Sequence, residues 1–70
     1  MHTGKIVKVT SKPKGFVLRV PAVPPETEPT DYTFAPVDAD DHAVALAAYT
    51  NGHDADVDGT PPACAGVTAR

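Results

Sequence analysis

Four prolines lie within residues 21–29, whose sequence is PAVPPETEP. Proline has no backbone N–H to donate to a sheet ladder, and it interrupts a helix, so this segment is neither a helix nor a central strand. We expect it to be an irregular, acidic connector within one small domain of residues 1–70, because a chain of this length forms at most one domain. The segments on either side of it must supply the regular structure.

Two strands are predicted before the connector. Residues 5–10, KIVKVT, alternate in the way expected of a strand. Residues 16–20, FVLRV, place Phe16 and Leu18 on the same face of a second strand. The link between them, SKPKG, contains a proline and a glycine, both of which are typical of turns. A β-hairpin is therefore predicted.

A third strand and one helix are predicted after the connector. Residues 31–37, DYTFAPV, have the composition of a strand. Asp38 or Asp40 can cap the helix that follows, because an aspartate side chain accepts hydrogen bonds from the first backbone N–H groups. Alanine-rich residues 43–48 favour the helix, and Gly52 is a suitable residue to end it.

One stripe of the predicted helix consists of small apolar residues. It is formed by Val44, Ala47 and Ala48. These side chains would let the helix approach a sheet or a second molecule closely, so the three residues are a candidate interface.

Residues 53–58, HDADVD, allow two interpretations. Asp54, Asp56 and Asp58 followed by glycine match the first half of an EF-hand calcium loop. The twelfth position of that loop would be Ala65, which has no carboxylate to bind the ion. A period of two is typical of a half-buried strand, so we interpret the segment as a strand.

The predicted order is strand, strand, strand, helix, strand, with a short final strand around Val67. The fold class is therefore mainly β with one helix. The order is that of an oligonucleotide/oligosaccharide-binding (OB) barrel, and we predict a small OB-like or split β-barrel. An SH3-like roll with an inserted helix is the main alternative.

Charge is distributed unevenly along the chain. The first twenty residues carry about +5 with no acid, whereas all nine acidic residues lie in residues 26–58, where there is no lysine or arginine. One interpretation is a basic surface for nucleic acid or another anion. The other is that the basic hairpin pairs with acidic segments of its own chain or of a neighbour. The candidate anion surface comprises Lys5, Lys8, Lys12, Lys14, Phe16 and Arg19.

Other candidate chemistry is sparse. His42 and His53 flank the helix, but its length keeps them too far apart to bind one metal ion in a single chain; we expect His42 on the surface and His53 at the start of a strand. Cys64 has no basic neighbour in the sequence to activate it. No nucleotide-binding or hydrolase motif is present. We predict a protein that is not an enzyme and has no catalytic residue, metal or cofactor.

Self-association is the expected source of additional stability. A chain this short buries only about 60% of its unfolded surface. It has two phenylalanines and no tryptophan, and its single cysteine cannot form an internal disulfide. We therefore predict a homo-oligomer, with residues 5–10 or 53–58 available to meet a partner's strand.

The single cysteine and the absence of a long apolar segment also predict a cytoplasmic protein without a membrane partner.

Three stretches, GKIVKV, YTFAPV and HAVALAAYTNGHDADVDG followed by a cysteine, resemble a group of small bacterial proteins. These share the OB barrel of the B subunits of bacterial AB5 toxins. The resemblance covers about residues 4–64, and it implies a barrel and a ring-like assembly. Members usually carry a cysteine pair and a signal peptide, which this sequence does not show. No binding residue is transferred from the group.

The predicted function is that of a small non-enzymatic binding or assembly module with an unknown protein or small-molecule ligand. One alternative is a single-stranded nucleic-acid binder that uses the basic hairpin. The other is a small intracellular inhibitor or a protein that sequesters a ligand.

Overall fold

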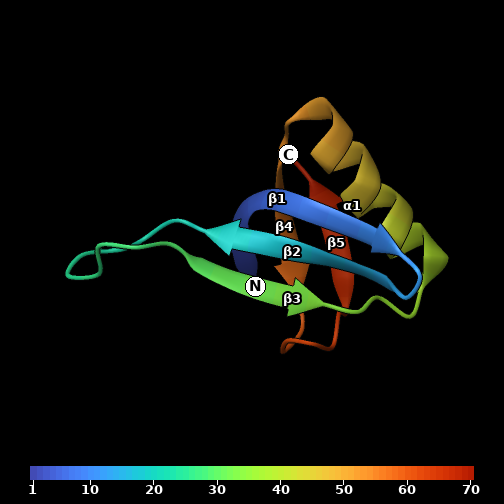
Figure 1. Ribbon diagram of the computed structural model, residues 1–70, viewed down its shortest axis with the longest axis horizontal. Helices are drawn as coiled ribbons and strands as arrows, with labels where there is room; N and C mark the ends of the chain where they lie inside the picture. The colour runs from blue at the N-terminus through green and yellow to red at the C-terminus, as the bar shows by residue number, and fades with distance from the viewer.

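The computed structural model describes residues 1–70, and its elements follow in the predicted order (Figure 1). They are β1 (His2–Ser11), β2 (Lys14–Val20), β3 (Thr30–Phe34), α1 (Ala39–Asn51), β4 (Asp54–Asp58) and β5 (Gly66–Ala69). The strands form one antiparallel sheet in the order β3-β2-β1-β4-β5. The prediction of a mainly β protein with one helix is confirmed.

Strand β1 is the centre of the sheet, and its two halves have different neighbours. Residues 2–5 pair with β4, and residues 5–11 pair with β2, with a register shift between Ile6 and Lys8. Such a shift bends a strand and increases its twist. Gly4 lies where β1 crosses the end of β2, and a Cβ at this position would overlap the carbonyl oxygen of Arg19. A side chain is therefore excluded at this crossing.

The inner face of the sheet and one side of α1 enclose the core. Phe16 and Phe34 are opposite each other in the β2–β3 register, and their rings stack with centroids 5.4 Å apart. Three of the nine core residues are alanines, so the core is small for the number of elements it joins. The nine are Ile6, Phe16, Leu18, Phe34, Ala45, Ala48, Ala55, Val57 and Val67.

Both ends of α1 are capped as the sequence predicts. Asp38 has extended backbone angles, and its carboxylate accepts a hydrogen bond from the N–H of Asp40 at 2.8 Å. Gly52 follows the helix with a φ of 70°, in the left-handed region that glycine adopts readily, and its N–H is directed to carbonyls of the last turn.

The face with which the helix packs overlaps the predicted stripe but is shifted by one residue. Ala45 and Ala48 are buried, Val44 is partly buried, and Ala47 is exposed. Val44 and Ala48 of the predicted stripe therefore pack in the core of their own chain, and only Ala47 is exposed. The error arises because small residues occur on every side of this helix.

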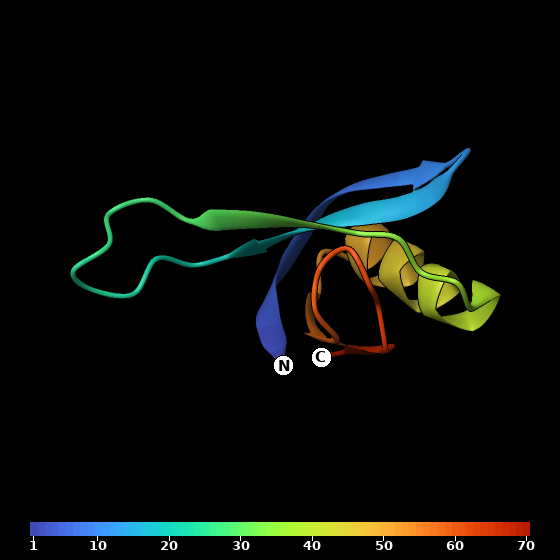
Figure 2. The same ribbon diagram turned by 90° about the horizontal axis from the view of Figure 1, so that it is seen from below.

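Residues 21–29 contain neither helix nor strand, as predicted. We call this segment the acidic arm because it carries Glu26 and Glu28 and no basic residue. Figures 1 and 2 show it extending from one end of the molecule, whereas the β1–β2 turn and the start of α1 lie at the opposite end. The longest dimension of the chain is 36 Å.

The sheet is not closed into a barrel. Its edges are β3 and β5. The residue that follows β3 and the segment that precedes β5 meet at an isolated parallel bridge between Ala35 and Ala63. There the N–H of Ala35 donates to the carbonyl of Pro62 at 2.8 Å. Residues 55–57 of β4 pair with β1 on one side and with β5 on the other, so the expectation of a free edge at residues 53–58 is wrong. Residues 6–11 of β1 pair only with β2 and have no strand on their other side.

The only helix, α1, is neither long enough nor apolar enough to cross a membrane.

Candidate functional surfaces

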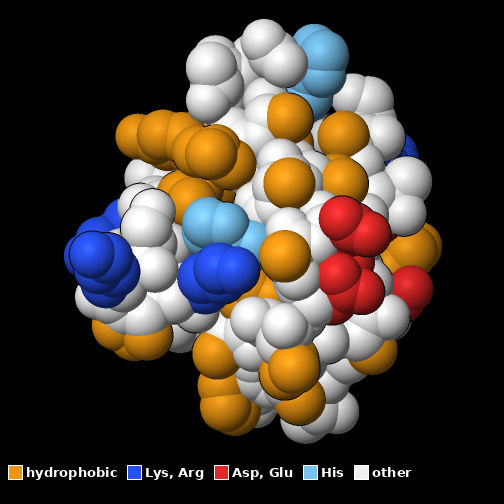
Figure 3. All heavy atoms as spheres, turned by 90° about the vertical axis from the view of Figure 1, so that its right-hand side faces the viewer, with side chains coloured by type: hydrophobic (Ala, Val, Ile, Leu, Met, Phe, Trp, Pro, Cys, Tyr) orange, Lys and Arg blue, Asp and Glu red, His pale blue; other side chains and the backbone are white.

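The lysines of the β1–β2 hairpin form the clearest charged surface. We call Lys5, Lys8, Lys12 and Lys14 the basic hairpin. All four side chains are exposed, and none forms an ion pair with an acid of the chain. Figure 3 shows the end of the molecule that contains the hairpin turn, with basic side chains on one side and acidic side chains on the other. The hairpin therefore carries four positive charges that no acid of the chain pairs.

Arg19 does not contribute a free charge to that surface. It lies opposite Asp31 in the β2–β3 register, and its guanidinium donates two hydrogen bonds to the carboxylate at 2.9 and 3.1 Å. The hydrogen bond from Arg19 holds the pKa of Asp31 below its usual value. The sequence did not identify this pairing, although Asp31 stands near the start of the predicted third strand.

Phe16 is a core residue and not part of an accessible site. Its exposed fraction is 1%, and its ring stacks on Phe34. Base stacking needs an accessible aromatic face. The predicted nucleic-acid surface therefore lacks its only aromatic member, although its lysines are exposed.

A second aromatic contact was not predicted at all. The ring of His2, on β1, lies 4.7 Å from the ring of Tyr32 and 5.9 Å from that of Phe34, measured between centroids. This contact joins the first residues of β1 to β3, which are not hydrogen-bonded neighbours.

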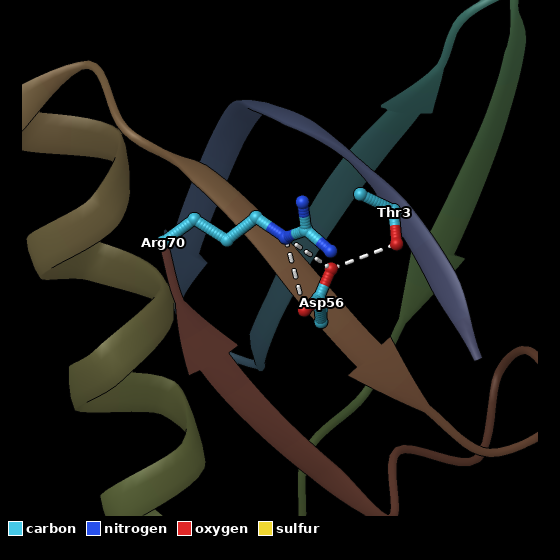
Figure 4. Close-up of polar contacts among 3 residues, drawn as sticks. All are labelled: Thr3, Asp56 and Arg70. Carbon is cyan, nitrogen blue, oxygen red and sulfur yellow. Dashed lines mark hydrogen bonds and ion pairs between the residues drawn. The ribbon is translucent and has the colours of Figure 1, made fainter.

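The aspartate row forms β4, as the sequence interpretation proposed. Ala55 and Val57 are buried, while Asp54 and Asp58 are exposed. Asp56 accepts a hydrogen bond from the Thr3 hydroxyl at 2.7 Å and forms an ion pair with Arg70 at 2.9 Å (Figure 4). It therefore links β1 and β4 to the residue that follows β5. Its role in the sheet is structural.

The partners of Asp56 change its ionisation. The hydrogen bond from Thr3 is the largest cause of a lowered pKa for Asp56, and the hydrogen bond and charge of Arg70 act in the same direction against partial desolvation. The carboxylate is therefore stabilised in its charged form.

His42 connects the helix to the hairpin, and this contact was missed because it joins residues 32 positions apart. Its Nε2 lies 2.8 Å from the carbonyl oxygen of Thr10, and the residue is partly buried. The expectation of a surface residue at His42 is therefore only partly correct. His53 is exposed and directly precedes β4 at the other end of the helix. The chain has no cluster of three or more metal-binding side chains.

Cys64 lies in the segment between β4 and β5 and is partly buried. Burial is the largest cause of the raised pKa of its thiol. A raised pKa disfavours the thiolate, which is the nucleophilic form. This environment is the opposite of that of an activated cysteine.

The outward side of α1 carries apolar side chains and no charge beyond its first turn. No charged residue occurs in residues 43–51. Leu46 and Tyr49 are 45% and 47% exposed, and they lie beside exposed Ala43 and Ala47. We call these four residues the helix patch. A helix whose free side lacks charge is typical of one that contacts a further surface.

No pocket occurs in the structure, so the candidate sites are open surfaces. No family model matches the sequence, and no curated protein or solved structure matches it either.

Proposed function

We propose that the protein is a self-associating binding module in which the helix patch forms a contact between copies. The observation that carries this proposal is the uncharged stretch of residues 43–51 of α1, in which Leu46 and Tyr49 are half exposed. Removing the remaining apolar surface of these side chains from water lowers the free energy of the assembly by roughly 25 cal/mol per Å².

The small core supports the same proposal. Nine buried apolar residues, three of them alanines, hold five strands and a helix together. Chains of this size commonly need a further source of stability, and association supplies one. The proposed interface keeps Ala47 and adds Ala43, Leu46 and Tyr49. Val44 and Ala48 are left out because they pack in the core of their own chain.

The fold of the module is proposed to be OB-like. Two observations support this: the strand order β3-β2-β1-β4-β5, and the parallel bridge between Ala35 and Ala63 on the side where closure would occur. OB folds are partly open five-stranded barrels that bind ligands on open surfaces.

The experiment is a measurement of molar mass by light scattering or sedimentation over a wide range of protein concentration. A mass that rises to a multiple of 7.3 kDa is expected. Thermal unfolding should shift to higher temperature as the concentration rises, because association stabilises the folded chain by mass action. A monomer mass and a constant melting temperature at high concentration would contradict the proposal.

Two matched variants test the helix patch itself. Leu46→Lys should give a folded species of lower mass, because it places a charge in the contact. Asn51→Lys adds the same charge at another exposed position of the same helix and should leave the mass unchanged. Equal masses for Leu46→Lys and the unmodified protein would remove the patch from the contact.

A further inference from the structure

The basic hairpin is not neutralised by its own chain. The two ion pairs of the structure are Arg19–Asp31 and Arg70–Asp56, and neither includes a lysine. Asp38, Asp40 and Asp41 begin the helix at the same end of the molecule, but no lysine lies within ion-pair distance of them. The Asp38 carboxylate is also used to cap the helix. Four exposed positive charges therefore remain available.

The acidic arm has the complementary property. Glu26 and Glu28 are exposed and form no ion pair, and Val23 has 64% of its surface exposed. The backbone hydrogen bond within the arm runs from the N–H of Glu26 to the carbonyl of Val23 at 2.9 Å. The arm therefore presents two carboxylates and an apolar side chain to whatever lies beyond it.

The geometry keeps the arm away from the turn of the basic hairpin within one chain, whereas Lys5, the strand partner of Arg19, lies nearer the arm. The arm leaves one end of the long axis, and the hairpin turn with Lys12 lies at the other end (Figures 1 and 2). Complementary charge at opposite ends of a molecule suits a head-to-tail contact, in which each copy uses both surfaces with two different neighbours.

We propose that the acidic arm of one copy docks on the basic hairpin of the next copy. This inference rests on the proposed self-association, and it names a second contact that does not use the helix patch. Glu26 and Glu28 pair with lysines of the neighbour's hairpin, and Val23 adds apolar contact. A repeated contact of this type closes into a ring or continues as a filament, depending on its rotation.

The charge of the contact predicts its response to salt. Exposed ion pairs are screened over about 10 Å at 0.1 M ionic strength, so head-to-tail association should weaken as salt is added. The contact through the helix patch is apolar and should not weaken in the same way. Salt therefore separates the two contacts in one protein.

The decisive experiment reverses the charges in pairs. One variant carries Glu26→Lys and Glu28→Lys, a second carries Lys12→Glu and Lys14→Glu, and a third carries all four changes. Each two-residue variant alone should lose the salt-sensitive association, with its dissociation constant raised about tenfold or more, because reversed charges repel the unchanged partner surface. A mixture of the two variants should recover it, and so should the four-residue variant, whose net charge equals that of the unmodified protein.

Three results would overturn the inference. One is an unchanged mass for both two-residue variants; if Leu46→Lys still dissociates the protein, the proposed function stands without the arm contact. The second is failure of both the mixture and the four-residue variant to recover association. The third is tight, salt-sensitive binding of a labelled single-stranded oligonucleotide that Lys12→Glu with Lys14→Glu abolishes while the mass stays unchanged, which would assign the hairpin to nucleic acid.

Discussion

Replacing Gly4 with alanine adds one methyl group at the crossing of β1 and β2. The new Cβ would overlap the carbonyl oxygen of Arg19, lie 2.8 Å from its carbonyl carbon and lie 3.1 Å from the Cα of Val20. All three are backbone atoms, so no side-chain rotation relieves the contact. The strands must separate, and this separation acts on the one strand that joins the two halves of the sheet.

The cost follows from two terms. Inserting a methyl group into well-packed structure costs about 1–3 kcal/mol, and each ladder hydrogen bond that is lost adds about 0.5–1.5 kcal/mol. We expect Gly4→Ala to lower the free energy of unfolding by about 3 kcal/mol or more. A chain of 70 residues has a total of roughly 4–10 kcal/mol, so this loss is about a third to three quarters of its stability.

Gly15→Ala is the matched control, measured in the same urea titration followed by circular dichroism. Gly15 is also buried in the hairpin, but its added Cβ would meet the carbonyl oxygen of Phe34 and the hydroxyl of Thr10 at 3.2 Å. A shift of a few tenths of an ångström relieves that contact, so its cost should stay below about 1 kcal/mol. Equal costs for the two variants, or a loss below about 1 kcal/mol for Gly4→Ala, would refute the steric argument.

Three further outcomes are expected. Phe16→Ala should lose about 3–5 kcal/mol in urea titration, whereas a merely surface-exposed ring would lose little. Asp38→Ala should lose about 1 kcal/mol in the same assay, because the N–H of Asp40 loses its acceptor. Acid titration of stability should show a contribution from Asp56 that is fully present above its unfolded pKa of about 4 and is lost as the pH falls through the lower folded-state pKa. Asp56→Asn should reduce this acid-dependent loss, and an unchanged acid profile would show that the Thr3 and Arg70 contacts do not stabilise the charged form.

Features set by neighbouring residues were predicted correctly. The hairpin, the capped helix and the aspartate strand depend on proline and glycine punctuation, on Asp38 and Gly52, and on the alternation of residues 54–58. The short last strand was also placed correctly around Val67. These signals depend only on neighbouring residues, so they can be read without knowledge of the tertiary structure.

The candidate surfaces depended on contacts between distant segments, and they were predicted less well. The alanines of α1 give no contrast between its sides, so the buried face of Ala45 and Ala48 could not be distinguished from its neighbours. Phe16 is different, because its alternation with Leu18 already placed it on one face, and that face is the inner one. Its assignment to an anion surface followed from nearby lysines and not from the strand pattern.

The position of β1 in the sheet also determines when the fold can form. Its first residues pair with β4, and the hydrogen bond from Thr3 to Asp56 spans 53 positions. Closing that loop costs about 1.5 kcal/mol more chain entropy than the loop of about ten residues between β2 and β3. The hairpin and β3 can therefore assemble early. During synthesis, however, the first residues of β1 stay unpaired on one side until β4 has left the ribosome. Folding should be slow for a chain of this length, since non-local pairing lowers the folding rate.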